Sequence, residues 1–536
     1  MGFLILPWYA AYDGFWSFIW VTDGYPTFHE YSPGILQIII HQRWWLWPVA
    51  LAMLIPLSVL SLPRSDSRYA LTLLFCGGLG FVFTLSQGFI LGLHGWGWEF
   101  LVEVFGTTEQ KQIGMGYGAL LVCCGFMFIF TQGLAARGAI KGDEFVCGSI
   151  GFCVVLITIF VFFPVGRILI NALQDDEGNY VFSLFLEKII SPSIWGLDCF
   201  SSQLSCGVAW NSLLMGVLVG ALTTALGLAF ALLVTRTKMH AKGFVRTASL
   251  LPIITPPFVI GLALILLFGR AGVVNIFLEW AFGIPPSRWL YGLTGILIAQ
   301  VLAYTPIAFL VLIGVVEAVS PSMEEASQTL RASRWQTFWT VSFPLMRPGL
   351  ANAFLLGFIE SLADFGNPLV LGGNFEVLST QIFFSIVGAQ GDPGMAAVLA
   401  IVLLIFTLTA FYAQRRWLGK KSYSTVTGKG DAGVHVKLPK RVSWLAYLTA
   451  FPFLAMSLIV YGMILFGGFV ETWGYKHNFT LKHYIAEFSL YWSDKHGLLW
   501  EGAAWNSFWT TIQISAISAP ITAGLGLLTA YILVRQ

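Results

Sequence analysis

The sequence predicts an all-α integral membrane protein with about eleven transmembrane helices. Hydrophobic residues make up 57% of the chain and charged residues only 10%, whereas a soluble domain carries about 25% charged residues. The apolar residues occur in continuous blocks of about 20, the length of helix that crosses a hydrocarbon layer of about 30 Å. A membrane β-barrel would instead show alternating segments of about 10 residues. The net charge of +2 gives no support for nucleic-acid binding.

The apolar blocks are the expected spans, and their limits follow from hydropathy. In chain order they cover residues 43–62, 69–93, 113–136, 145–170, 211–235, 246–269, 291–317, 348–372, 394–414, 443–468 and 506–534.

The distribution of Lys and Arg predicts the orientation of these spans. Basic residues gather in every second loop, as in residues 64–68, 137–141 and 415–421. Positively charged loops stay in the cytoplasm, so this set is expected to face inside. The loops expected outside are 94–112, 171–210, 270–290, 373–393 and 469–505.

The chain also contains an internal repeat. Residues 209–212 (AWNS) open a block that ends at Arg236, and the same four letters at 504–507 open a block that ends at Arg535. Both copies run from outside to inside, which predicts two homologous halves in parallel orientation. The second copy stops after its first matching span, and residues 3–9 resemble the last turn of a helix. The sequence is therefore expected to be a piece of a longer chain.

The loop at 319–347 carries the most informative pattern. Ser320 and Pro321 are typical of an N-cap and a first helical position. Glu324 and Glu325 follow near the positive end of the helix dipole. An apolar stripe at helical spacing is formed by Met323, Ala326 and Leu330. The pattern predicts a short amphipathic helix at the cytoplasmic surface that fits a partner's groove; an ordinary interfacial helix is the alternative.

The second part of this loop is expected to be a separate helical piece. Pro344 and Pro348 are predicted to end it before the next span begins.

This loop resembles the EAA loop of ABC importer permeases. Residues 325–327 (EAS) stand in the place of Glu-Ala-Ala, and residues 332–335 (ASRW) and 343–345 (FPL) also fall where the family has similar residues. The family usually has glycine in place of Arg331, and glycine adopts φ > 0 at a bend more readily than arginine. The resemblance implies a coupling helix that docks on a nucleotide-binding subunit. Its residues are Glu324, Glu325, Ala326, Ser327, Arg331, Ser333, Arg334 and Pro344, with Glu325, Ala326 and Arg334 making the contact and Ser333 and Pro344 setting the shape.

The resemblance also implies a domain organisation, with the five-helix core of type I importers (the MetI-like fold) in the middle of the chain. The expected parts are an N-terminal membrane extension at 1–144, a first permease domain at 145–414, a cytoplasmic linker at 415–442, and the start of a second permease domain at 443–536.

Two acidic residues lie inside the block 348–372. Glu360 and Asp364 are four residues apart, so a continuous helix would present both on one face near mid-membrane. Burying charged carboxylates in lipid is costly, and we therefore expect them, with Asn367, to line a substrate pathway. The alternative is an interhelical hydrogen bond with one carboxyl protonated. Pro368 is expected to disturb the helix and free carbonyls near Asp364.

The string at 361–373 (SLADFGNPLVLGG) resembles the ferric-iron branch of the family, which often fuses both membrane domains in one chain. Carboxylates are oxygen ligands suited to hard cations, but two of them do not make a metal site. The resemblance implies ferric iron as cargo. Related fused permeases carry sugar phosphates, phosphonates or thiamine, and these stay as alternatives.

Two of the seven cysteines, Cys199 and Cys206, lie in a polar loop that is expected outside. An oxidising periplasm permits a disulfide between them, and two free thiols are the alternative. Neither cysteine has histidine partners at zinc-ligand spacing, so no metal site is predicted.

The sequence contains no G-x-x-x-x-G-K-[S/T] motif and no catalytic constellation. We therefore expect a permease subunit, not an enzyme, in a bacterial inner membrane. The resemblance implies an ABC ATPase dimer on the cytoplasmic face, which would hold ATP and Mg, and a periplasmic substrate-binding protein; no cofactor is expected on this chain. The rival functions are an ion-coupled secondary transporter and a membrane enzyme using Glu360 and Asp364.

Overall fold

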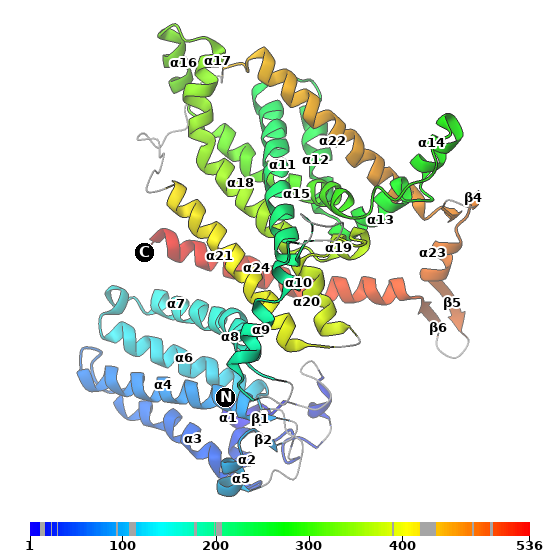
Figure 1. The fold of residues 1–536 in the computed structure, drawn as a ribbon. Coiled ribbons are helices and arrows are strands. Elements are labelled where there is room, and N and C mark those ends of the chain that lie inside the picture. Colours follow the sequence, from blue (N-terminus) through cyan, green and yellow to red (C-terminus); the bar gives the residue numbers. More distant parts are fainter. Residues whose placement is uncertain are drawn as a thin grey trace. The chain divides into compact units, whose positions relative to one another are not determined.

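The computed structural model of the chain describes residues 1–536 apart from 11–16, 23, 29, 93–94, 107–113, 176–178, 198, 200–205, 389–390, 419–435, 474–475, 494–496 and 536. The chain forms two compact units (Figure 1). The first consists of Met1–Pro164 with Thr510–Gln536, and the second of Val165–Trp509. Most of the predicted linker 415–442 and part of the predicted outer loop 171–210 lie outside the described residues.

The structure confirms the predicted all-α membrane fold. Within the described part of the chain, nine helices are long and apolar enough to cross a membrane. Each overlaps one of the predicted blocks. They are Ser67–Ile90, Tyr117–Ala136, Glu144–Asn171, Val208–Arg236, Pro257–Phe282, Leu293–Glu317, Pro393–Leu418, Lys440–Gly467 and Ala503–Val534.

The two remaining blocks fold as interrupted helices. The block 43–62 forms the apolar stretch Trp44–Val59, which changes from 3₁₀ to α and back to 3₁₀. The block 348–372 forms α18 (Phe343–Ala363) and, after a break, α19 (Gly366–Leu371).

The block 246–269 is not one continuous helix as predicted. Helix α12 (Lys242–Leu250) passes into a 3₁₀ turn at Leu251–Ile253, and α13 (Pro257–Phe268) starts afresh. Pro252, Pro256 and Pro257 explain the interruption, because proline lacks the N–H that continues a helix and clashes with the preceding turn.

The first unit contains a layer of three long helices, α4, α6 and α7, which lie side by side (Figure 1). Gly77 of α4 lies against the backbone of Phe130 in α6, where a Cβ would come within 2.4 Å of the Phe130 nitrogen, so a small residue sets this close packing. The elements are α1 (Gly2–Ile5), α2 (Gly34–Ile39), α3 (Trp47–Leu54), α4 (Ser67–Ile90), β1 (Leu91–Gly92), β2 (Gly95–Trp96), α5 (Glu99–Phe105), α6 (Tyr117–Ala136) and α7 (Glu144–Ile157), with β1 and β2 antiparallel.

The second unit begins with α8 (Phe163–Asn171), whose first two residues belong to the first unit. It continues with α9 (Phe182–Ile189), α10 (Pro192–Trp195), α11 (Val208–Arg236), α12, α13, α14 (Val273–Phe282), α15 (Leu293–Glu317), α16 (Pro321–Thr329), α17 (Arg334–Thr337), α18, α19, α20 (Leu378–Val387) and α21 (Pro393–Leu418).

Helices α11, α15 and α18 pack against one another and form the core of the second unit. Small residues let these helices approach closely, as at Gly227 of α11, where a Cβ would meet the Phe309 nitrogen of α15 at 2.8 Å. Phe230 and Phe309 fill the neighbouring space with ring centroids 6.0 Å apart. This core holds the ends of α11, α15 and α18 in fixed relation to one another.

Helix α22 (Lys440–Gly467) packs on α11, α12 and α13. The Phe453 ring meets Phe230 of α11 edge-on at 5.5 Å, and the Tyr461 hydroxyl donates to the Leu251 carbonyl at 2.9 Å. The chain then forms two antiparallel hairpins around a short helix and enters α24. These elements are β3 (Val470–Thr472), β4 (Lys476–Phe479), α23 (Lys482–Glu487), β5 (Ser489–Ser493), β6 (Gly497–Glu501) and α24 (Ala503–Arg535).

Candidate functional site

The predicted loop 319–347, which we call the EAA-like loop, folds at one end of α18 (Figure 1). Its first helix, α16, starts as expected, with Ser320 at the N-cap and Pro321 in the first turn. The second helix, α17, is fixed by a capping box: Gln336 N–H donates to Ser333 Oγ at 3.3 Å, and Ser333 N–H donates to Gln336 Oε1 at 2.9 Å. Ser333 therefore shapes the loop by closing the turn between the two helices.

Arg331 occupies the bend between α16 and α17 with φ +64°. Its N–H donates to the Gln328 carbonyl at 2.9 Å, and the Ala332 N–H donates to the Ser327 carbonyl at 3.2 Å. The left-handed region costs a non-glycine residue about 1–2 kcal/mol. The bend thus has the conformation that favours glycine, and this chain makes it with arginine.

Pro344 and Pro348 do not end the second helical piece, and this prediction was wrong. A π-helical stretch at Phe338–Ser342 connects α17 directly to α18, which starts at Phe343. Pro344 sits in the first turn of α18, where a missing N–H is tolerated, and Pro348 lies within the helix. The wider π turn accommodates the change of register.

The two neighbouring glutamates of α16 differ in burial. Glu324 is buried and pairs with Arg236, the last residue of α11; the side chains are 2% and 3% exposed. Arg236 Nη1 donates to both carboxylate oxygens at 2.7 and 2.6 Å, and Nη2 donates to the Val316 carbonyl at 3.0 Å. Ser342 Oγ donates to Glu324 Oε1 at 2.6 Å and the Val436 N–H to Oε2 at 3.2 Å. Glu324 is therefore anchored inside the protein.

Glu325, by contrast, lies on the exposed face of the loop, together with Ala326 and Arg334. Large apolar side chains of the same loop are exposed too: Leu330 is 84% exposed, and Met323, Trp335 and Trp339 are exposed as well. The Trp335 and Trp339 rings contact each other at 5.6 Å. An exposed apolar cluster of this kind, next to charged residues, is typical of a surface that binds another protein.

The helix that carries the predicted substrate-pathway residues is broken at Asp364. Helix α18 ends at Ala363, and Asp364 is extended with ψ 115°, so Glu360 and Asp364 do not share one continuous helix as predicted. Pro368 has no N–H for the Asp364 carbonyl, which accepts instead from the Ser379 hydroxyl at 2.7 Å.

The Asp364 carboxylate is buried and accepts three hydrogen bonds. Its Oδ2 accepts from Gln300 Nε2 at 3.0 Å and from Asn367 Nδ2 at 2.8 Å, and Oδ1 accepts from the Asn367 N–H at 3.2 Å. Gln300 in turn accepts from Ser361 Oγ at 2.6 Å. This network joins α15 to the break between α18 and α19. Asp364 and Asn367 therefore position these helices relative to one another.

Glu360 differs from Asp364 in both exposure and contacts. Its side chain is half-buried, and its carboxylate makes no hydrogen bond or ion pair with any residue that the structure describes. An acidic group without a partner in an apolar helix is expected to face water or a polar cargo. Of the three predicted pathway residues, Glu360 is the one with a free carboxylate.

Cys199 and Cys206 are joined by a disulfide, with Cα atoms 4.8 Å apart. Lys188 of α9 donates to Asp392 Oδ1 at 2.8 Å, just before α21 begins. Partial burial raises the pKa of Asp392, but the hydrogen bonds from Lys188 and the Met395 N–H outweigh it and hold the pKa below its usual range. The disulfide closes the segment before α11, and the Lys188–Asp392 ion pair joins α9 to the start of α21.

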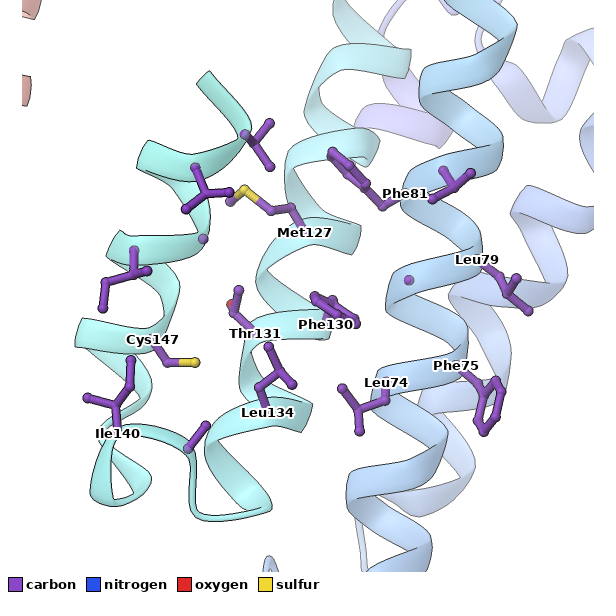
Figure 2. A pocket seen from close by; sticks show the side chains of 17 residues that line it. Leu74, Phe75, Leu79, Phe81, Met127, Phe130, Thr131, Leu134, Ile140 and Cys147 are labelled. Atoms are coloured by element: carbon purple, nitrogen blue, oxygen red, sulfur yellow. The ribbon is translucent and has the colours of Figure 1, made fainter. Parts of the chain in front are cut away.

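A cavity of about 670 Å³ lies between α4, α6 and α7 of the first unit (Figure 2). Its lining is apolar, with side chains such as Leu79, Met127 and Phe130. Thr131 also lines it, but its hydroxyl already donates to the Phe128 carbonyl at 3.0 Å. A lining of this chemistry suits a hydrocarbon chain and not an ion, so the cavity is not a candidate pathway for polar cargo.

Sequence reasoning missed four participants in these sites: Arg236, Ser342, Gln300 and the main chain of Val436. In the sequence pattern, Arg236 marks only the end of the first repeated block. A signal for Gln300 was present, because a buried amide in an apolar span requires a polar partner. Nothing in the pattern around Val436 indicated a contact with α16.

Comparisons with known proteins give a consistent result. The family model described as "Binding-protein-dependent transport system inner membrane component" matches residues 223–419. A putative ferric transport system permease of Haemophilus influenzae is 40% identical over 433 residues (81% of this chain), and that of Actinobacillus pleuropneumoniae is 40% identical over 437 residues (81% of this chain). The molybdenum transport system permease of Azotobacter vinelandii is 31% identical over 209 residues, which are 37% of this chain and 91% of that protein.

The ferric permeases are longer than this sequence. The chain spans 65% of the length of the Haemophilus protein and 61% of the Actinobacillus protein. The matched family region contains α15, the EAA-like loop and α18 to α21, and thus both sites described above.

Proposed function

Because the chain belongs to the family of binding-protein-dependent transport system inner membrane components, we propose that it is the permease subunit of an ATP-driven importer for ferric iron. The observation that carries the transport mechanism is the EAA-like loop, whose short helix α16 presents Glu325 beside an exposed apolar cluster. The observation that carries the cargo is the 40% identity with two ferric transport permeases.

The energy for transport comes, in this proposal, from an ATPase dimer that docks on the EAA-like loop. ATP and Mg are bound by that partner, and this chain contributes no nucleotide site and no cofactor. Leu330, Trp335 and Trp339 supply apolar contact area, while Glu325 and Arg334 give charge complementarity that sets the partner's orientation. A periplasmic substrate-binding protein delivers the cargo at the opposite face.

Glu360 is the residue that we assign to the cargo pathway. Ferric iron is a hard cation that favours oxygen ligands, and a free carboxylate in an apolar helix attracts it without holding it tightly. Asp364 and Asn367 hold the break in the helix next to Glu360 through their hydrogen bonds to each other and to Gln300. The molybdenum permease is the relative that would suggest an oxyanion as alternative cargo.

The proposal is tested by ATPase activity of the full permease, reconstituted with its cognate ATPase and binding protein. Binding protein loaded with ferric iron should stimulate hydrolysis, whereas a sugar phosphate or molybdate should not. A Glu325→Lys change should uncouple hydrolysis from uptake because it reverses the charge on the docking face, while the spans still insert. Stimulation by binding protein loaded with another compound would show that this compound, and not ferric iron, is the cargo. Normal uptake by the Glu325→Lys variant would refute the docking role.

A further inference from the structure

The buried pair of Arg236 and Glu324 is not explained by stability alone. Removing two charges from water costs several kcal/mol, and apolar residues of similar volume often serve a fold equally well. Both side chains here are almost fully covered. The pair also joins two elements that are far apart in the chain, the end of α11 and the first turn of α16.

The pair is the main inward attachment of α16. Among the residues of this helix, only Pro321 and Glu324 are buried, and the others lie partly or fully exposed. A force applied to α16 from outside would therefore be carried inward in part through the Glu324 carboxylate. That carboxylate is held by Arg236 at the end of α11 and by Ser342 at the start of α18.

The same carboxylate also holds the end of the linker that leads to α22. The Val436 N–H donates to Glu324 Oε2 at 3.2 Å, and residues 436–439 close a crevice lined by Leu232, Phe338 and Met346. Helix α22 starts immediately afterwards, at Lys440. A displacement of Glu324 would thus reach α11, α18 and α22 together.

We propose that Arg236, Glu324, Ser342 and the Val436 main chain form a joint that transmits movement of the EAA-like loop to the membrane helices. Arg236 and Glu324 are positioning residues: they touch neither cargo nor nucleotide, and act by making α16 move with α11. The inference rests on the proposed function, because the movement originates in the partner ATPase. The ion pair is the rigid element of the joint, and its hydrogen bonds connect the ends of α11, α15 and α18.

The test compares a single with a double variant of the full permease. Glu324→Gln leaves Arg236 buried without its counter-charge, so it should lower both stability and coupling. The double variant Arg236→Met/Glu324→Gln removes both charges and keeps similar volumes, so its thermal stability should return to near the wild-type value. Stimulation of ATPase by loaded binding protein should nevertheless stay roughly fivefold or more below wild type, the usual size of an allosteric coupling.

A second readout needs no partner protein. Trypsin cleavage at Arg331 and Arg334 in the isolated permease reports how firmly the loop is held, because both side chains are exposed. Cleavage should be faster in the single and the double variant than in wild type. The matched controls are Glu317→Gln and Lys238→Gln, which remove one exposed charge each next to the joint and should change neither readout.

Two results would refute the proposal that these residues form a joint. If the double variant regains wild-type ATPase stimulation, the pair contributes only to stability. If trypsin cleaves the loop at the wild-type rate in both variants, the pair does not hold α16 at all. Absence of stimulation in the wild-type complex would refute the proposed function instead, and the trypsin comparison would still decide whether the pair anchors the loop.

Discussion

At the scale of single residues, neighbouring positions with the same chemistry have different tasks. Glu324 and Glu325 are adjacent, yet Glu324 is buried in an ion pair with Arg236 and Glu325 lies on the exposed face of the EAA-like loop. Asp364 and Glu360 form a similar contrast, because the first is surrounded by donors and the second has a free carboxylate. The burial and the hydrogen-bond partners of each carboxylate, not its residue type, distinguish the acids that position helices from those whose carboxylates are free to bind other groups.

The bend residue Arg331 yields a stability prediction. Arg331→Gly should raise the thermal unfolding midpoint of the detergent-solubilised permease, because it removes a left-handed strain of about 1–2 kcal/mol, partly offset by the greater freedom of glycine in the unfolded chain. The matched control is Arg334→Gly, which removes the same charge in the first turn of α17 and should lower the midpoint. A lower midpoint for Arg331→Gly would contradict the strained bend.

At the scale of elements, the sequence pattern predicted helices well and their breaks only in part. In the apolar block 348–372, the disturbance expected from Pro368 is present, and the Asp364 network accompanies it where the block divides into α18 and α19. At 246–269, three prolines divide the block, a signal that hydropathy alone does not weigh. The opposite occurred at Pro344, where a π-helical stretch lets the helix continue. Such outcomes depend on tertiary partners that a single sequence does not reveal.

The break after α18 gives a paired prediction. Asp364→Ala should lower stability by about 1–3 kcal/mol, because Gln300 and Asn367 lose their buried acceptor. Glu360→Gln should leave the unfolding midpoint unchanged but reduce iron uptake, because its carboxylate has no described protein partner. Thermal unfolding and uptake, measured on both variants, separate the two roles. Equal loss of stability in both would refute the assignment of Glu360 to the pathway.

At the scale of the whole molecule, composition and loop charge predicted the membrane fold, and the resemblance of residues 325–327 and 361–373 predicted the family. The site was only partly predictable. The residues of the EAA-like loop could be named from the sequence, but the Arg236–Glu324 contact spans 88 positions and leaves no local trace. Long-range pairs of this kind come from the packing of α11 against α15 and α18, which periodicity does not specify.

We propose that ATP hydrolysis drives ferric iron through this permease. The most direct test of this proposal is uptake of radioactive ferric iron into proteoliposomes that contain the full permease, its cognate ATPase and loaded binding protein, with and without a protonophore uncoupler. We expect accumulation that requires ATP on the ATPase side and persists when the uncoupler is present. Uptake that the uncoupler abolishes, and that continues without ATP, would contradict it and identify an ion-coupled secondary transporter.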